Sequence, residues 1–356
     1  MKKSNFYLGL IAALILMSVS VSAEKKPKNV IVMIGDGMGL PQMYSAMTAN
    51  NNHLQLERCT YTGFSKTYFS DHYTTDSGAG GTAIACGVKT KNGMIGMTPD
   101  SVKIESILEL SERNQLSTGI VVTCAVTHAT PASFIAHQVN RDMYEEIATD
   151  FLKTDIDVFI GGGLKYFNNR KDQVNLVEKL KNKNYQVAYS LDEALNVKSG
   201  KLAGLFYEDH CPAMPKRGDM LPKSVIAAID ILDNNKKGFF LMVEGSQIDW
   251  AAHDNDKKQI VKEMLDFDET IGKVLDFAQR DGNTLVIITA DHETGGMTIL
   301  NGKFGSDDMD AYFSTKNHSG VPVPIYAFGP GAEQFTGIME NTAFKGKIEK
   351  LLDFKK

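Results

Sequence analysis

Runs of apolar, mostly β-branched residues alternate along the chain with longer segments in which apolar residues recur every three or four positions. Six short runs have the composition of buried strands: residues 30–34, 119–124, 157–160, 238–243, 285–289 and 325–328. The longer segments predict helices over residues 102–114, 171–181, 221–234, 256–280 and 342–354. Strands that alternate with helices predict an α/β fold with a mostly parallel central sheet sandwiched between helices.

The N-terminal residues have the pattern of a secretory signal peptide. Lys2 and Lys3 precede an apolar stretch over residues 8–21, and Ala23 closes a cleavage sequence of small residues. This stretch is short for a membrane span, which takes about 20 residues. We therefore expect residues 1–23 to be removed on export to the periplasm or the medium, with an uncleaved anchor as the alternative. No linker divides the remainder, so residues 24–356 are expected to form a single domain.

Composition excludes some partners and leaves the redox state open. Removing Lys2 and Lys3 from 38 basic residues leaves 36 against 43 acidic ones, a formal charge of −7. No basic run is dense enough to predict a nucleic-acid-binding surface. The four cysteines lack CxxC spacing, and their pairing in disulfides is undecided from sequence: they are Cys59, Cys86, Cys124 and Cys211.

Ser77 is the most informative residue for chemistry. It follows the carboxylate of Asp76 and precedes a run of small residues, 78–83, that is able to begin a helix. A serine at a helix N-terminus has backbone amides beside its Oγ. That setting suits a nucleophile that receives a phosphoryl group, and no Ser-His-Asp arrangement has a readable spacing.

Carboxylates and imidazoles occur in separate clusters suited to metals. Glu244 ends one strand, and Asp249 and His253 follow it at a spacing of four, which puts both on one helical face. A carboxylate with an imidazole suits zinc. The alternative is a solvated Asp–His pair near a helix start.

Further candidates follow other strands. Asp36 lies between two glycines after strand 30–34, and Asp291 and His292 follow strand 285–289. Ligands of open α/β sheets gather outside the carboxyl ends of the strands, so these residues are expected at one edge. Ordinary polar turns are the alternative for all three, and His318 by itself is typical of a surface histidine.

Two further residues have open roles. Thr130 stands directly before Pro131 and is expected to cap a helix, to bind a metal, or both. Arg141 follows 13 residues after His128, and spacing alone assigns it no function.

Together these segments resemble alkaline phosphatases over nearly all of the chain after residue 23. The resemblance runs in order through residues 34–39, 75–77, 128–131, 141, 244–253, 291–296 and 318. It implies two zinc sites, the first formed by Asp249, His253 and His318 and the second by Asp36, Asp291 and His292. It implies a third site, for magnesium, formed by Asp36, Thr130 and Glu244. It also implies that Ser77 becomes phosphorylated, that Arg141 binds the phosphate, and that Asp76 holds Arg141.

Two positions near these ligands depart from the best-known bacterial pattern. His128 stands where that pattern has aspartate, and Trp250 stands where it has lysine. The difference leaves open which metal fills the third site.

The resemblance implies a hydrolase that converts phosphate monoesters of broad range into an alcohol and inorganic phosphate. Family members are often homodimers, and we expect the same here. A phosphodiesterase of the same superfamily and a non-catalytic phosphate- or zinc-binding protein are the alternatives.

Overall fold

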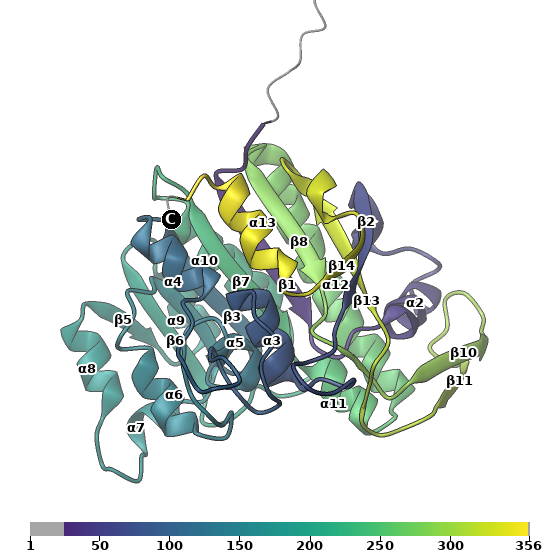
Figure 1. Ribbon diagram of the computed structural model, residues 1–356, viewed down its shortest axis with the longest axis horizontal. Helices are drawn as coiled ribbons and strands as arrows, with labels where there is room; N and C mark the ends of the chain where they lie inside the picture. Colours follow the sequence, from purple (N-terminus) through teal and green to yellow (C-terminus); the bar gives the residue numbers. More distant parts are fainter. Residues whose placement is uncertain (1–24, 355–356) are drawn as a thin grey trace, which may run out of the picture.

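A ten-stranded sheet runs through the middle of the molecule and carries helices on both faces (Figure 1). The computed structural model describes residues 25–354. From one edge to the other the strands are β14 (Gly337–Glu340), β2 (Tyr61–Lys66), β13 (Val323–Phe328), β8 (Thr284–Thr289), β1 (Asn29–Gly35), β7 (Phe239–Gly245), β3 (Ser117–Ala125), β4 (Val158–Gly162), β6 (Lys201–Tyr207) and β5 (Tyr185–Ala188). Within this sheet only β13 runs antiparallel to its neighbours, so the predicted fold class is confirmed.

The helices divide between the two faces. One face is covered by α3 (Ser77–Cys86), α4 (Ile107–Arg113), α5 (Ala129–Ala132), α6 (Tyr144–Asp150), α7 (Lys165–Asn168), α8 (Leu176–Asn182) and α13 (Ala343–Leu351). The other is covered by α2 (Leu40–Ala49), α9 (Leu191–Asn196), α10 (Met220–Leu232), α11 (Gln247–His253) and α12 (Lys257–Asp281). Two small antiparallel pairs complete the strands: β10 (Met297–Asn301) with β11 (Asp310–Phe313), and β9 (Glu293–Thr294) with β12 (His318–Ser319).

Two hydrophobic cores, one on each face, explain the continuous apolar runs of the central strands. Strand β1 sends Val30, Val32 and Ile34 into one core and Ile31 and Met33 into the other, and all five are fully buried. A parallel strand covered on both faces needs apolar residues at successive positions, because side chains alternate across the sheet.

All six predicted strands are present, with ends within two residues of the predicted ones. Two predicted helices begin five residues later than expected. Helix α4 begins at Ile107 instead of residue 102, because Ser106 and Glu109 form a reciprocal capping box at its start. Helix α8 begins at Leu176 instead of residue 171, because the Asn175 side chain caps it there.

The carboxyl ends of β1, β7 and β8 lie side by side, and these strands carry or directly precede four of the predicted metal ligands, Asp36, Glu244, Asp291 and His292. This arrangement confirms that one edge of the sheet collects them. The predicted signal peptide, residues 1–23, lies outside the described residues. Within residues 25–354, no helix combines the length and apolarity needed to cross a bilayer.

Candidate active site

Ser77 is the first residue of α3 and is 2% exposed. Asp76 caps this helix, because its Oδ1 accepts a hydrogen bond from the Ala79 amide at 2.9 Å. Its Oδ2 accepts a second one from the Gly93 amide, also at 2.9 Å. The predicted position of Ser77 at a helix N-terminus is therefore confirmed. The positive end of the helix dipole favours negative charge beside its Oγ.

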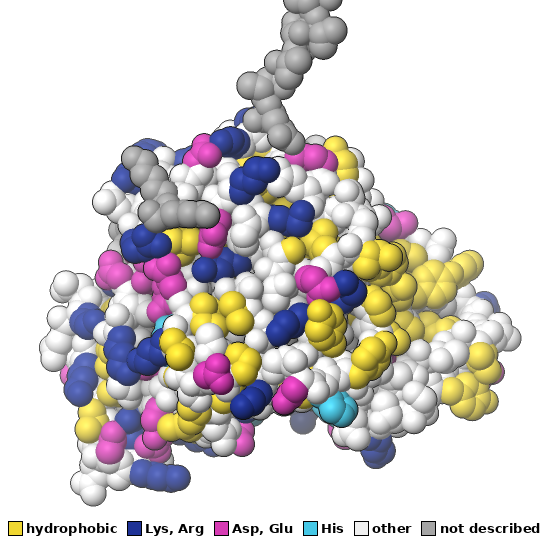
Figure 2. Space-filling view, viewed as in Figure 1, with side chains coloured by type: hydrophobic (Ala, Val, Ile, Leu, Met, Phe, Trp, Pro, Cys, Tyr) yellow, Lys and Arg dark blue, Asp and Glu magenta, His cyan; other side chains and the backbone are white. Residues whose placement is uncertain are grey.

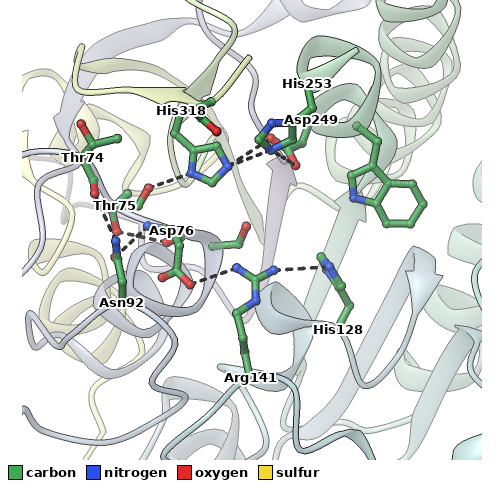
Figure 3. A pocket seen from close by; sticks show the side chains of 12 residues that line it. Thr74, Thr75, Asp76, Asn92, His128, Arg141, Asp249, His253 and His318 are labelled. Carbon is green, nitrogen blue, oxygen red and sulfur yellow. Dashed lines mark hydrogen bonds and ion pairs between the residues drawn. The ribbon is translucent and has the colours of Figure 1, made fainter. Parts of the chain in front are cut away.

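Asp249, His253 and His318 converge on one point (Figure 3). The Nε2 atoms of His253 and His318 lie 3.3 and 3.5 Å from oxygens of Asp249 and 3.1 Å from each other. Each Nδ1 faces a backbone carbonyl, that of Lys316 at 2.5 Å and that of Thr75 at 2.8 Å. Because a carbonyl only accepts, both Nδ1 atoms donate, so each ring can offer its Nε2 to a cation once that nitrogen carries no proton.

Asp36, Asp291 and His292 form a second group, with no exposed side-chain surface. The Nε2 of His292 lies 3.4 Å from Asp36 Oδ1 and 3.3 Å from Asp291 Oδ2. The same nitrogen is 3.2 Å from Ser77 Oγ. The structure thus brings the second predicted ligand set together beside the predicted nucleophile.

Unbalanced negative charge makes this region a candidate cation site. Burial, followed by the charges of Asp249 and Glu244, raises the pKa of Asp291 to about 8. Burial, with Asp291 as the next cause, also raises the pKa of Asp36 well above its usual value. Among the described residues, Asp36 Oδ1, Asp291 Oδ2 and Glu244 Oε1 are buried without a hydrogen-bond partner. Since buried charges are normally paired or bound to metals, the donor set fits divalent cations.

Asp249 differs from the other carboxylates. Burial raises its pKa, but the hydrogen bond with His253 and the neighbouring histidines outweigh burial, so the net pKa is lowered. The same hydrogen bond raises the pKa of His253 to about 9. A cation bound here therefore has to displace the proton of His253.

The third predicted ligand set also comes together. Glu244 is fully buried at the end of β7, and burial raises its pKa to about 7. The Thr130 hydroxyl donates to Asp36 Oδ2 at 3.4 Å. The prediction that Thr130 caps a helix is wrong: α5 begins at Ala129 with His128 at the capping position. Because Thr130 lies inside the first turn, its hydroxyl reaches Asp36.

Arg141 lies across the cavity from His253 and His318 (Figure 3). Its Nη1 lies 3.0 Å from Asp76 Oδ2, and its Nη2 lies 3.4 Å from His128 Nε2. The cavity has a volume of about 430 Å³, and Ser77 and Trp250 also line it. A guanidinium with five N–H donors has further donors for an anion beyond these two contacts.

His128 lies next to Arg141 and packs against two other aromatic rings. The rings of His210 and Trp250 meet it edge-on, with centroids 5.7 and 5.8 Å away. Burial, and then the charge of Arg141, lowers the pKa of His128 to about 3, so its imidazole is neutral. Its Nδ1 is buried without a hydrogen-bond partner among the described residues. Sequence reasoning gave His210 no role.

Sequence reasoning gave three further residues of the site no role in it. Thr294 Oγ1 lies 2.5 Å from Asp249 Oδ1 and 3.3 Å from His292 Nδ1. Its place two residues after His292 was the available clue, because alternate residues of an extended segment share a side. The Oδ1 of Asn92 accepts a hydrogen bond from the backbone amide of Asp76 at 2.9 Å. Cys124 lies 3.4 Å from Glu244, and all four cysteines are free thiols.

Comparisons with known proteins identify the family of the chain. The sequence profile of the alkaline phosphatase family matches residues 27–311. Alkaline phosphatase 4 of Bacillus subtilis is 36% identical, over 93% of this chain and 91% of that protein. Alkaline phosphatase of Escherichia coli is 30% identical, over 90% of this chain and 85% of that protein.

Solved structures give the same result. Alkaline phosphatase from the Antarctic bacterium TAB5 superimposes with a TM-score of 0.89 and 41% identity, covering 93% of this chain and all of that one. A variant of that enzyme with aspartate in place of a histidine has magnesium bound in its M3 site; it superimposes with a TM-score of 0.88 and 40% identity, covering 93% of this chain and 99% of that one.

Proposed function

The chain belongs to the alkaline phosphatase family, and we propose that Ser77 and Arg141 carry out its reaction. It is an enzyme that hydrolyses phosphate monoesters to an alcohol and inorganic phosphate. The observation that carries the assignment is the place of Ser77. Its Oγ lies 3.2 Å from His292 Nε2, in the cavity that Arg141 also lines.

Arg141 would bind the phosphoryl group of the substrate. Its planar fork of donors matches two phosphate oxygens. Asp76 holds the guanidinium in place through an ion pair. Because the Arg141 side chain is already ordered, it loses less conformational entropy when it binds the phosphoryl group. Ser77 Oγ would attack phosphorus in line with the ester oxygen, so that the phosphoryl group moves to Ser77 and the alcohol leaves. Water would then release phosphate from phospho-Ser77.

We propose that the donor groups hold two zinc ions and one magnesium ion. Asp249, His253 and His318 form the first zinc site, and Asp36, Asp291 and His292 form the second. Asp36, Thr130 and Glu244 form the magnesium site, which the all-oxygen donor set supports. Bound metals at such a centre stabilise negative charge on the attacking and leaving oxygens. The magnesium of the TAB5 variant supports a third site in this fold.

The proposed enzyme is a single domain, residues 24–356, exported after removal of residues 1–23. The single domain is supported by the ten-stranded sheet, because the first and the last strand of the chain, β1 and β14, both belong to it. The pattern of the first 23 residues supports export to the periplasm or the medium.

The proposed assembly is a homodimer. Hydrophobic side chains gather on the β2–β14 side of the face in Figure 2. Ile338 of β14 and Phe64 of β2 are register partners and are 73% and 39% exposed. Contact with a second copy would remove this surface from water. Size-exclusion chromatography is expected to give the mass of two chains.

Hydrolysis of a chromogenic phosphate monoester, compared with the matching diester, tests the assignment. The enzyme is assayed at alkaline pH with zinc and magnesium, and a chelator-treated sample is assayed in parallel. Ser77→Ala is compared with Ser70→Ala, which removes the hydroxyl of an exposed serine. We expect a strong preference for the monoester, loss of activity on chelation, a large loss in Ser77→Ala, and no loss in Ser70→Ala.

Each other result has a defined meaning. A preference for the diester would assign the same site to a phosphodiesterase. Phosphate binding without turnover would indicate a binding protein. Full activity in Ser77→Ala would contradict the proposal that Ser77 is the nucleophile.

A further inference from the structure

Cys124 brings a thiol to the third proposed metal site. Strands β3 and β7 are neighbours, and Val122 pairs with Glu244 in their register. Because alternate residues share a face, Cys124 lies on the same side of the sheet as Val122. Its Sγ donates to Glu244 Oε2 at 3.4 Å, and both residues are fully buried.

His128 completes a compact set of donors. One ligand atom each from Cys124, His128 and Glu244 lies within 4.8 Å of the others. Glu244 Oε1 and His128 Nδ1 are both buried without a hydrogen-bond partner among the described residues. Buried polar atoms normally have partners, so these two atoms point to a ligand that the side chains alone do not supply.

The chemistry of these donors differs from that of the all-oxygen magnesium set. Thiolate and imidazole favour borderline cations such as zinc or cobalt(II), whereas magnesium prefers oxygen ligands. Glu244 belongs to both sets. A cation held by Cys124 and His128 therefore competes with magnesium for the same carboxylate.

We propose that Cys124, His128 and Glu244 form a soft-donor site for zinc or cobalt(II) that competes with magnesium for the third metal position. The inference rests on the proposed function only through Glu244. On binding, the cation replaces the Cys124 thiol proton, which passes to solvent, and a metal–sulfur bond forms.

Cobalt(II) titration of the metal-free full chain tests this proposal. A thiolate ligand gives a sulfur-to-cobalt charge-transfer absorption in the near ultraviolet, which oxygen and nitrogen ligands do not give. We expect this absorption in the parent protein, and we expect excess magnesium to suppress it. Cys124→Ser should lose the absorption, with cobalt binding at this site weakened about tenfold or more.

Cys86→Ser is the matched control. Cys86 is another buried thiol on the same face of the sheet, but its Sγ donates hydrogen bonds to two backbone carbonyls, those of Ile104 and Ser133. This variant should keep the absorption. Cys124→Ala serves as a second variant, and the circular dichroism of both Cys124 variants verifies that they fold.

The results separate this proposal from the phosphatase mechanism. An absorption that is absent from the parent, or that persists in folded Cys124→Ser, overturns the soft-donor site even if monoester hydrolysis is normal. An absorption that resists saturating magnesium overturns the sharing of Glu244. Ser77→Ala touches no thiol, so it should keep the absorption whether or not Ser77 is the nucleophile.

Discussion

The hydrogen bonds of Thr294 favour the tautomer of His292 whose Nε2 lone pair faces the proposed metal ligands. The Asp249 carboxylate only accepts, so the Thr294 hydroxyl donates to it across 2.5 Å. The remaining lone pairs of that hydroxyl accept the proton of His292 Nδ1 at 3.3 Å. The Nε2 lone pair of His292 is then free to face Asp36 and Asp291.

Replacing Thr294 with valine is predicted to weaken zinc binding. The variant keeps the shape of the side chain but removes both hydrogen bonds, so zinc affinity should fall about 10- to 100-fold. Competition with a chromogenic chelator measures this affinity, and monoester hydrolysis at limiting zinc should fall in parallel. Thr294→Ser keeps the hydroxyl and should restore both. An unchanged zinc affinity in Thr294→Val would show that His292 is oriented by its other contacts.

Individual residues of the site differ in whether the sequence predicts their contacts. The spacing of four between Asp249 and His253 predicts a shared helical face, because that relation is local. The contact between Thr294 and Asp249 spans 45 residues and depends on how β9 packs against α11. The place of Thr294 two residues after His292 indicates a shared side with that ring, but no local pattern indicates the contact with Asp249.

At the scale of elements, a very short strand pair brings His318 to the site. Strand β12 pairs with β9, so that His318 lies opposite Thr294. This pairing stacks the rings of His292 and His318 at 3.5 Å between centroids. Strands of two residues have no measurable periodicity, so only the family resemblance placed His318 with the other ligands.

Arg217 ties the segment before α10 to helix α12. It is almost fully buried, and its Nη2 donates to Glu263 and Asp266 at 2.6 Å each. Burial raises the pKa of Asp266 to about 6, and Arg217 opposes this rise. Removing the guanidinium would leave two buried carboxylates without their cation.

Arg217→Met is therefore predicted to destabilise the fold by about 3–5 kcal/mol. Because a carboxyl with a raised pKa favours folding when protonated, the loss should be larger at pH 8 than at pH 5. Denaturant unfolding at the two pH values measures the difference. Lys223→Met breaks an exposed pair with Asp219 and should change little. An equal loss at both pH values would contradict the role of the carboxylates.

His137 gives helix α4 a pH-dependent contact. Its Nε2 lies 2.9 Å from Glu109 and its Nδ1 lies 2.8 Å from the Gly96 carbonyl. Burial lowers its pKa, but the hydrogen bonds with Glu109 and Gly96 outweigh burial, and the net pKa is raised. Because both partners accept, the ring makes both bonds only when protonated.

The contact is predicted to stabilise the fold fully below about pH 6.5, the usual pKa of histidine, and to be lost as pH rises through the raised value. His137→Gln should cost about 1–2 kcal/mol at pH 5.5 and less at pH 9. Thermal unfolding across this range measures the difference between variant and parent. A constant difference would show that His137 acts through packing instead of charge.

At the scale of the whole molecule, strands that are far apart in the sequence place their carboxylates close together at one site. Asp36, Glu244 and Asp291 come from the ends of β1, β7 and β8, which are adjacent in the sheet. Parallel strands end at a common edge, so the sequence predicts that these carboxylates gather. It does not predict the strand order, because pairing between distant strands leaves no local pattern.

This centre has a consequence for stability that removal of metal should reveal. Asp36, Asp249, Asp291 and Glu244 are at most 4% exposed and lie close enough to repel one another. Bound cations remove this repulsion in the folded chain only. A cation at a concentration about a thousand times its Kd adds about 4 kcal/mol to the free energy of unfolding.

Chelation is therefore predicted to lower the unfolding temperature by about 5–10 °C, and added zinc should restore it. Differential scanning calorimetry, with metal analysis of the same samples, measures the change. Ser77→Ala keeps every proposed metal ligand and should lose as much stability on chelation as the parent, although we expect it to lose most of its turnover. If the stripped protein, shown to be free of metal, unfolds at the original temperature, the converging carboxylates are stabilised by protonation alone. If only the parent responds and Ser77→Ala does not, the cations depend on Ser77, and the ligand sets proposed here are incomplete.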